Sequence, residues 1–155
     1  MSNSIFDKNI AQLIELESYL KLHQNLNDSI SNETIGWHIA HSCQVINTIT
    51  NAIVNSDPSK AKPKFSGLYY WIMLTNHIPR GKVKAPNIVS PKKTISKEEI
   101  IEEIENAKAN LQTLASTELN KYFTHPIFGD LNVPKTLRFF TVHTHHHLKI
   151  IRDIQ

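Results

Sequence analysis

The sequence predicts an all-α fold, an antiparallel four-helix bundle with one additional short helix. Apolar side chains recur every three or four residues over four long segments, which is the spacing of an amphipathic helix. The chain has only 4 glycines and 7 prolines, so long regular elements are favoured over many turns. No segment has a pattern that clearly indicates a strand. With 155 residues, 40% of them hydrophobic, residues 1–155 are expected to form a single domain around one core.

The first two long helices are predicted by their apolar spacing. One should span residues 4–26 and the other about 33–55, with the polar segment 27–32 between them. The second helix has many β-branched residues, but their regular spacing outweighs their modest helix propensity. The residues that step by three and four along it are Ile35, Ile39, Ser42, Ile46, Ile49 and Ile53.

A short helix is predicted within residues 65–77, which are almost continuously apolar. Periodicity alone does not separate a buried helix from a buried strand here, and we favour a buried helix because no neighbouring segment supplies a strand partner. Pro79 should end it. The basic loop that follows, residues 80–93, either borders a ligand site or is a solvated crossover.

Two further helices complete the predicted bundle. Residues 96–99, Ser-Lys-Glu-Glu, have the form of a capping box, so a helix should begin there and continue to about Ser116. Residues 124–132 resemble a turn. Pro134 should lie in the first turn of a last helix that runs to the C-terminus.

The composition indicates the cellular compartment and limits the classes of partner that are expected. Cys43 is the single cysteine, which excludes an internal disulfide and favours a reducing, cytoplasmic compartment. No apolar run approaches the ~20 residues of a membrane span, and residues 1–8 show no secretory signal, so no membrane partner is expected. The 17 basic and 14 acidic residues give a net charge of +3, and no reading helix or zinc finger accompanies it, so no nucleic-acid partner is expected.

Histidine is the unusual feature of the composition, with nine residues, five of them from position 125 onward. His143 and His147 lie one helical turn apart on the face that carries the apolar residues of the last helix, so both should point inward. His145 falls on a charged, solvated row, and His146 lies at the boundary between the two faces.

Two imidazoles at positions i and i+4 on an inward face can converge on one cation. A third ligand must come from another helix, and the second helix offers His38 and His41, both bordering the core. The alternative interpretation is that these histidines are simply packed or solvated. Burying several imidazoles without partners would cost about 1–3 kcal/mol for each unmet polar group, and a metal ion or bound water removes that cost.

Three neutral imidazoles suit zinc, nickel or iron and leave open positions on the ion. A water bound there has its pKa lowered toward about 7, and a thiolate or a carbonyl can bind instead. No His-Glu-x-x-His motif supplies an evident general base. Asp7, Glu33 and Asp130 are candidates for that role only by default.

Three segments of the chain resemble the DinB-like superfamily of four-helix bundles, which includes proposed metal-dependent hydrolases and small-thiol transferases. They are Gly-Trp-His-Ile-Ala-His-Ser at 36–42, His-Pro-Ile-Phe-Gly-Asp-Leu at 125–131 and His-Thr-His-His-His-Leu at 143–148. The resemblance implies that segment 125–131 is a helix-entry motif lining the site. It also implies a metal held by one histidine of the second helix and an i, i+4 pair of the last, which correspond to His41, His143 and His147.

From this resemblance we expect a divalent-metal-dependent enzyme, a hydrolase or a thiol transferase, that acts on a small molecule. The metal is expected to be zinc or nickel, with iron as a further option, and a low-molecular-weight thiol is a candidate substrate or cosubstrate. The alternative is a non-catalytic metal- or ligand-binding bundle. The sequence departs from the family's common Gln-Ile after the last ligand, where it has Lys149-Ile150. It leaves open whether His38 or His146 assists at the site, and whether the protein is a homodimer.

Overall fold

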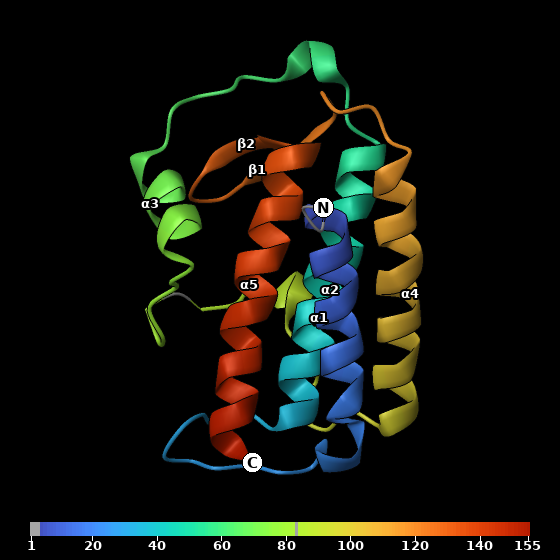
Figure 1. Cartoon of the computed structure of the whole chain (residues 1–155), viewed down its shortest axis with the longest axis vertical. Coiled ribbons are helices and arrows are strands. Elements are labelled where there is room, and N and C mark those ends of the chain that lie inside the picture. The colour runs from blue at the N-terminus through green and yellow to red at the C-terminus, as the bar shows by residue number, and fades with distance from the viewer. Residues whose placement is uncertain (1–3, 83) are drawn as a thin grey trace.

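The computed structural model describes residues 4–82 and 84–155, and four long helices form its body. These long helices lie side by side and include antiparallel neighbours, and a short helix lies at the side of the bundle (Figure 1). The predicted all-α bundle with an additional short helix is therefore confirmed. The helices are α1 (Ile5–Ser18), α2 (Ile35–Val54), α3 (Gly67–Thr75), α4 (Lys97–Ala115) and α5 (Val133–Ile154).

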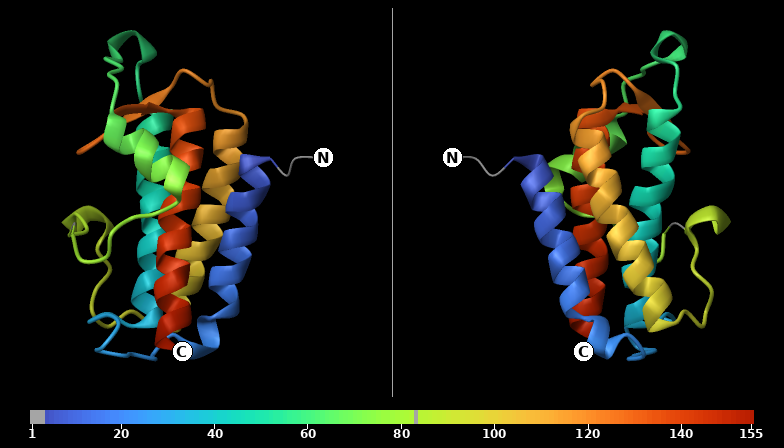
Figure 2. Two further views of the ribbon diagram at one scale, coloured as in Figure 1. Left: turned by 60° about the vertical axis from the view of Figure 1, so that its left-hand side comes forward. Right: turned by 90° about the vertical axis from the view of Figure 1, so that its right-hand side faces the viewer.

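The order of the helices explains the long connection in the middle of the chain. Helices α2 and α4 pack against each other extensively and run in the same direction, as do α1 and α5 (Figure 1). A chain that leaves the end of α2 must therefore return along the bundle before α4 can begin. Residues 55–96 make this return and contain α3, which packs against α5 (Figure 2).

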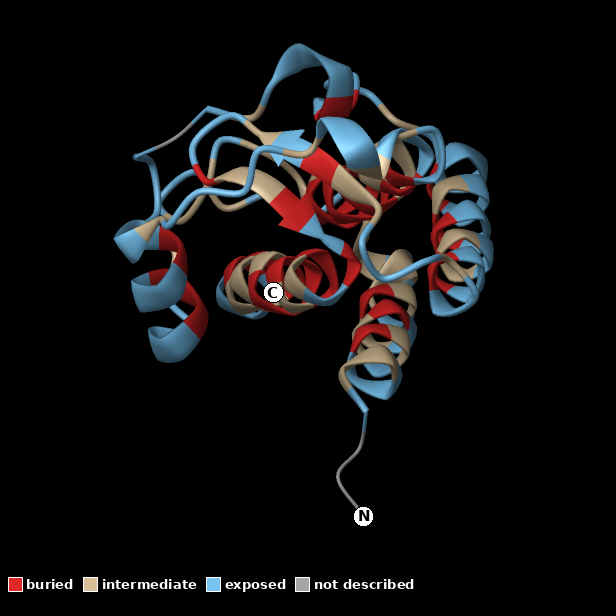
Figure 3. Cartoon of the chain, turned by 90° about the horizontal axis from the view of Figure 1, so that it is seen from above, coloured by how far each residue is buried: buried red, intermediate tan, exposed pale blue. Residues whose placement is uncertain are grey.

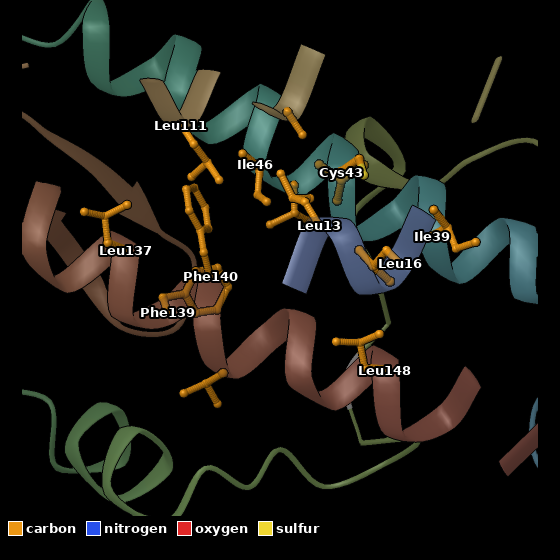
Figure 4. Close-up of a cluster of buried hydrophobic side chains, with 14 of the residues drawn as sticks. Leu13, Leu16, Ile39, Cys43, Ile46, Leu111, Leu137, Phe139, Phe140 and Leu148 are labelled. Carbon is orange, nitrogen blue, oxygen red and sulfur yellow. The ribbon is translucent and has the colours of Figure 1, made fainter. Parts of the chain in front are cut away.

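The core lies between the inward faces of the four long helices. Viewed from above, each of these helices has its buried residues on the side that faces the others, as its apolar spacing predicts (Figure 3). Phe140 of α5 is fully buried and lies near the centre. Figure 4 shows it pointing toward Leu13 of α1, Ile46 of α2 and Leu111 of α4, so all four helices contribute to one core.

Capping boxes define the start of two helices. At α4, the Ser96 hydroxyl accepts a hydrogen bond from the Glu99 N–H, and the Glu99 carboxylate accepts one from the Ser96 N–H. The predicted capping box is thereby confirmed. Ser4 and Asp7 form the same arrangement at α1. Each box satisfies backbone donors that have no partner within the helix.

We expect Ser96→Ala to lower the free energy of unfolding by about 1 kcal/mol, because the substitution leaves the Glu99 N–H without its acceptor. Urea unfolding followed by circular dichroism measures the change. Glu102→Ala on the same helix is the matched control, since this side chain is exposed and should contribute little. Equal stability of the two variants would contradict the expectation.

The first helix is shorter than its apolar spacing predicts. The α-helix ends at Ser18, and the chain continues through a 3₁₀ turn, Leu20–Leu22. The chain then passes close to the start of α2, where the Gly36 N–H donates to the His23 carbonyl at 2.8 Å. A β-carbon at position 36 would lie 2.9 Å from that oxygen, so glycine permits this close approach of the two segments.

The short helix α3 is present, but the expectation that it is buried is wrong. Tyr69, Ile72 and Met73 face the bundle and are buried. The opposite side is exposed, because α3 packs on the outside of α5 and not within the core (Figure 1). Within residues 4–82 and 84–155, no helix has both the length and the apolarity needed to cross a membrane.

A two-stranded antiparallel hairpin occupies the segment for which the sequence indicates a turn. Strands β1 (Tyr122–His125) and β2 (Gly129–Asn132) pair in register, with Phe123 opposite Leu131. Four residues are too few for an alternating pattern to stand out in the sequence. The hairpin leads directly into α5, so it sets the position where the last helix begins.

Candidate metal centre

Three of the histidines converge between α2 and α5. His41 from α2 and His143 and His147 from α5 each offer a ring nitrogen, and these nitrogens lie within 4.8 Å of one another. The ring centroids are 4.7 to 5.1 Å apart. Ligands of a tetrahedral zinc ion with bonds of about 2.0–2.1 Å lie about 3.4 Å apart, so the rings must rotate slightly inward to close on an ion. The cluster is compatible with binding of a divalent metal.

His41 is oriented by the loop that precedes α4. Its Nδ1–H donates to the Val89 carbonyl at 2.5 Å, and its ring stacks on Trp37 at 4.9 Å between centroids. The indole N–H of Trp37 in turn donates to the Pro91 carbonyl. Because a carbonyl only accepts, Nδ1 of His41 must carry the proton, which leaves the Nε2 lone pair free. The loop therefore borders the histidine cluster and is not merely a solvated crossover.

His147 contacts a further histidine, His38, on the side away from the cluster. The Nδ1 atoms of His38 and His147 lie 2.9 Å apart, and Nε2 of His38 lies 2.9 Å from the Ser31 hydroxyl. Both rings are buried. The structure thus distinguishes the two candidates on α2, because His41 joins the cluster of three whereas His38 contacts one of its members from outside.

His143 has an unmet polar atom. Its Nδ1 is buried and, among the residues that the structure describes, has no hydrogen-bond partner. The ring packs against Phe139, with centroids 5.5 Å apart, and is half-buried as a whole. An unpaired buried nitrogen costs about 1–3 kcal/mol, so a bound ion or water that engages this ring would recover stability. This orphaned atom and the three-imidazole donor set both fit a divalent cation.

Burial keeps the cluster in the form that binds metals. It lowers the pKa of His41 and, together with the neighbouring histidines, lowers the pKa of His143 and His147. The same cause, followed by His41 and His146, lowers the pKa of His38 to about 3. A neutral imidazole has a lone pair to donate, and a protonated one does not. The rings are therefore neutral at physiological pH.

The lowered pKa values predict that the metal-free protein loses stability in acid. In the unfolded chain these histidines titrate near 6.5, whereas His38 in the folded chain titrates at about 3. Below pH 6.5 the unfolded chain therefore binds protons that the folded chain does not, and the free energy of unfolding falls as the pH decreases. Urea unfolding with chelator at about pH 7.5 and about pH 5 measures the fall. His38→Asn should reduce it, and equal stability at both pH values would contradict it.

The other two histidines of α5 lie beside the cluster. His146 contacts His147 edge-on with centroids 5.0 Å apart, and burial, followed by the nearby Arg80 and Lys149, lowers its pKa to about 4. His145 is half-buried on the charged side of the helix. Neither belongs to the group whose nitrogens converge.

Segment 125–131 spans the end of β1, the hairpin turn and most of β2, and the hairpin leads into α5. His125 accepts hydrogen bonds at Nδ1 from the backbone N–H groups of Ile127 and Phe128, and its ring stacks on Phe128. Phe139 packs against both His125 and His143, with centroids 5.1 and 5.5 Å away. The hairpin therefore reaches the cluster through one aromatic ring.

Two of the three carboxylates considered as a general base, Asp7 and Asp130, have structural contacts instead, and Glu33 lies outside the group of converging ligand atoms. Asp7 caps α1, and Asp130 accepts hydrogen bonds from the Lys62 N–H and the Thr124 hydroxyl. Among the described residues, no carboxylate joins the three converging histidines. Cys43 is fully buried, and burial raises the pKa of its thiol, so it is a core residue and not a nucleophile.

Comparison with known families agrees with the geometry. A family model described as the DinB superfamily matches residues 25–151, a span that contains α2, most of α5 and all three converging histidines. No curated protein matches the chain.

Proposed function

The chain belongs to the DinB superfamily, and on that premise we propose that it binds one divalent metal ion through His41, His143 and His147 and acts on a small molecule. The observation that supports this most strongly is the convergence of three neutral, largely buried imidazoles from two helices. A bound divalent ion would supply Lewis-acid chemistry toward a carbonyl, a water or a thiol. Imidazole ligands favour zinc or nickel, with iron as a further option.

The protein's own residues would hold and shield the ion. His41 and His147 are almost completely buried, and Nδ1 of His143 is buried as well, so the protein would shield a bound ion from solvent on several sides. The loop carbonyl of Val89 orients His41, and His38 contacts His147. Rings held in this way need little reorganisation when an ion binds.

We propose that the nucleophile comes from outside the chain. The one thiol, Cys43, is buried in the core, and no carboxylate of the described residues lies within the cluster. We therefore favour either hydrolysis, with water as the nucleophile, or transfer to a low-molecular-weight thiol. Such a thiol would be available in the reducing cytoplasm, which is the compartment that we propose for the protein.

Metal analysis of protein purified without a histidine tag tests the binding. We expect about one zinc, nickel or iron atom per chain, and loss of that metal in His143→Ala. His145→Ala is the matched control, because this histidine lies on the same helix outside the cluster. Substoichiometric metal that does not change in His143→Ala would exclude the site.

A substrate screen separates an enzyme from a binder. Amide, ester and thiol-transfer substrates are offered to the metal-loaded protein with and without chelator. Turnover that chelator abolishes and His143→Ala lacks supports catalysis. Stoichiometric metal without turnover of any of these substrates favours the non-catalytic metal- or ligand-binding bundle.

A further inference from the structure

Three side chains from separate parts of the chain form a continuous hydrogen-bonded line that ends at the histidine cluster. Ser31, in the turn before α2, contacts Nε2 of His38 at 2.9 Å, and Nδ1 of His38 contacts Nδ1 of His147 at 2.9 Å. Both histidines are buried, so solvent does not compete for these contacts. Each contact requires one atom to donate a proton and the other to accept it.

The protons along this line can be arranged in two ways. In the first, His147 donates from Nδ1 to His38, and His38 donates from Nε2 to the Ser31 oxygen. In the second, both donations reverse, and Nε2 of His147 carries a proton. The two arrangements contain the same number of protons and differ only in the tautomers of the two rings.

Only the first arrangement permits a metal at His147. Its Nδ1 is engaged with His38, so Nε2 is the nitrogen that remains for an ion, and there it must present a lone pair. The Ser31 oxygen can accept as this requires, because a hydroxyl has two acceptor positions. One takes the Glu33 N–H at 3.1 Å, and the other is free for Nε2–H of His38.

We propose that Ser31 and His38 form a support that holds His147 in its Nδ1–H tautomer, with Nε2 committed to the metal. His38 is thus a positioning residue that acts through His147 and does not bind the ion. This inference rests on the proposed metal site. It assigns to His38 a role complementary to that of the Val89 carbonyl, which holds His41 in the corresponding tautomer.

Nuclear magnetic resonance of ¹⁵N-histidine-labelled wild-type protein, with zinc alone as the probe, reads the tautomers directly. In the zinc-loaded protein we expect a proton on Nδ1 of His147 and on Nε2 of His38, and a zinc-induced shift at Nε2 of His147. Zinc bound through Nδ1 of His147, or a proton on Nδ1 of His38, would overturn the proposal. The measurement needs no variant and no enzymatic activity.

Zinc affinity of variants, measured by competition with a chelator, gives an independent test. His38→Leu removes the acceptor and should weaken binding about 10–100-fold. His38→Asn retains an acceptor oxygen near the position of Nδ1 and should recover most of the loss. His146→Leu is the matched control, because His146 also packs against His147 but has no hydrogen bond to it among the described contacts. Circular dichroism establishes that each variant is folded.

The outcomes separate this inference from the function on which it rests. If wild-type protein binds no zinc, nickel or iron, the proposed function fails. If wild-type protein binds zinc and His38→Leu binds it equally well, only the role of His38 fails. If His38→Leu does not fold, the role of His38 is judged from the zinc affinities of His38→Asn and Ser31→Ala and from the histidine tautomers of the wild-type protein. Ser31→Ala should shift the tautomer of His38 and weaken zinc binding by about tenfold at most.

Discussion

Saturating zinc is expected to raise the thermal midpoint of the wild-type protein by about 8–16 °C, and the His147→Ala variant should lose this shift. An ion that binds only the folded chain, at about 1,000 times its dissociation constant, adds about 4 kcal/mol, and each kcal/mol moves the midpoint by about 2–4 °C in a chain of this size. Two remaining imidazoles hold an ion much less tightly, so the stabilisation should disappear. Differential scanning fluorimetry with and without chelator measures the shift.

The shift must be compared within each variant, because replacing a buried imidazole also changes the metal-free protein. His41→Ala should behave like His147→Ala, since both contribute to the cluster. His145→Ala, outside the cluster on α5, should retain the wild-type shift. A zinc-induced shift that survives in His41→Ala and His147→Ala would contradict the three-histidine site.

Phe140→Ala is expected to lower the free energy of unfolding by about 3–5 kcal/mol, the usual cost of removing a buried phenylalanine. The side chain is fully buried and points toward residues of the three other long helices (Figure 4). Its removal leaves a cavity that helices already packed on several sides cannot readily fill. Since small proteins are stable by only about 5–15 kcal/mol, the loss is a large fraction of the total.

Urea unfolding of metal-free protein measures this loss. Phe65→Ala is the matched control, because the same atoms are removed from a ring that is 83% exposed. We expect Phe65→Ala to change stability by less than about 0.5 kcal/mol. Similar losses in the two variants would show that the core does not lie where the four helices meet.

Much of the helical architecture could be predicted because its signals are local. The seam of isoleucines along α2 repeats every three or four residues, and the boundaries Ile35–Val54 lie close to those expected from it. At α4, Ser96 and Glu99 are three residues apart and define the helix start through contacts with each other's backbone. Such contacts depend little on the rest of the chain.

The errors arose where distant parts of the chain decide the outcome. The aromatic sequence of α3 is as apolar as a core helix, but the long connection places α3 outside α5, where Trp71 and Leu74 remain exposed. The strands of the hairpin are too short to show a pattern, and the turn between them ends at Gly129 with a φ of 75°, a conformation that glycine adopts without strain. The first helix ends early where the chain turns toward α2.

The candidate site shows the same difference between local signals and contacts between distant segments. The sequence by itself determined that His143 and His147 share an inward face, because a spacing of four residues on a helix places two side chains together in any environment. Only the tertiary structure decided that His41 meets them while His38 lies behind His147, because this depends on how α2 is rotated against α5. It also brought Val89 and Ser31 to these rings, since a hydrogen bond between distant segments forms only when packing has already placed both partners.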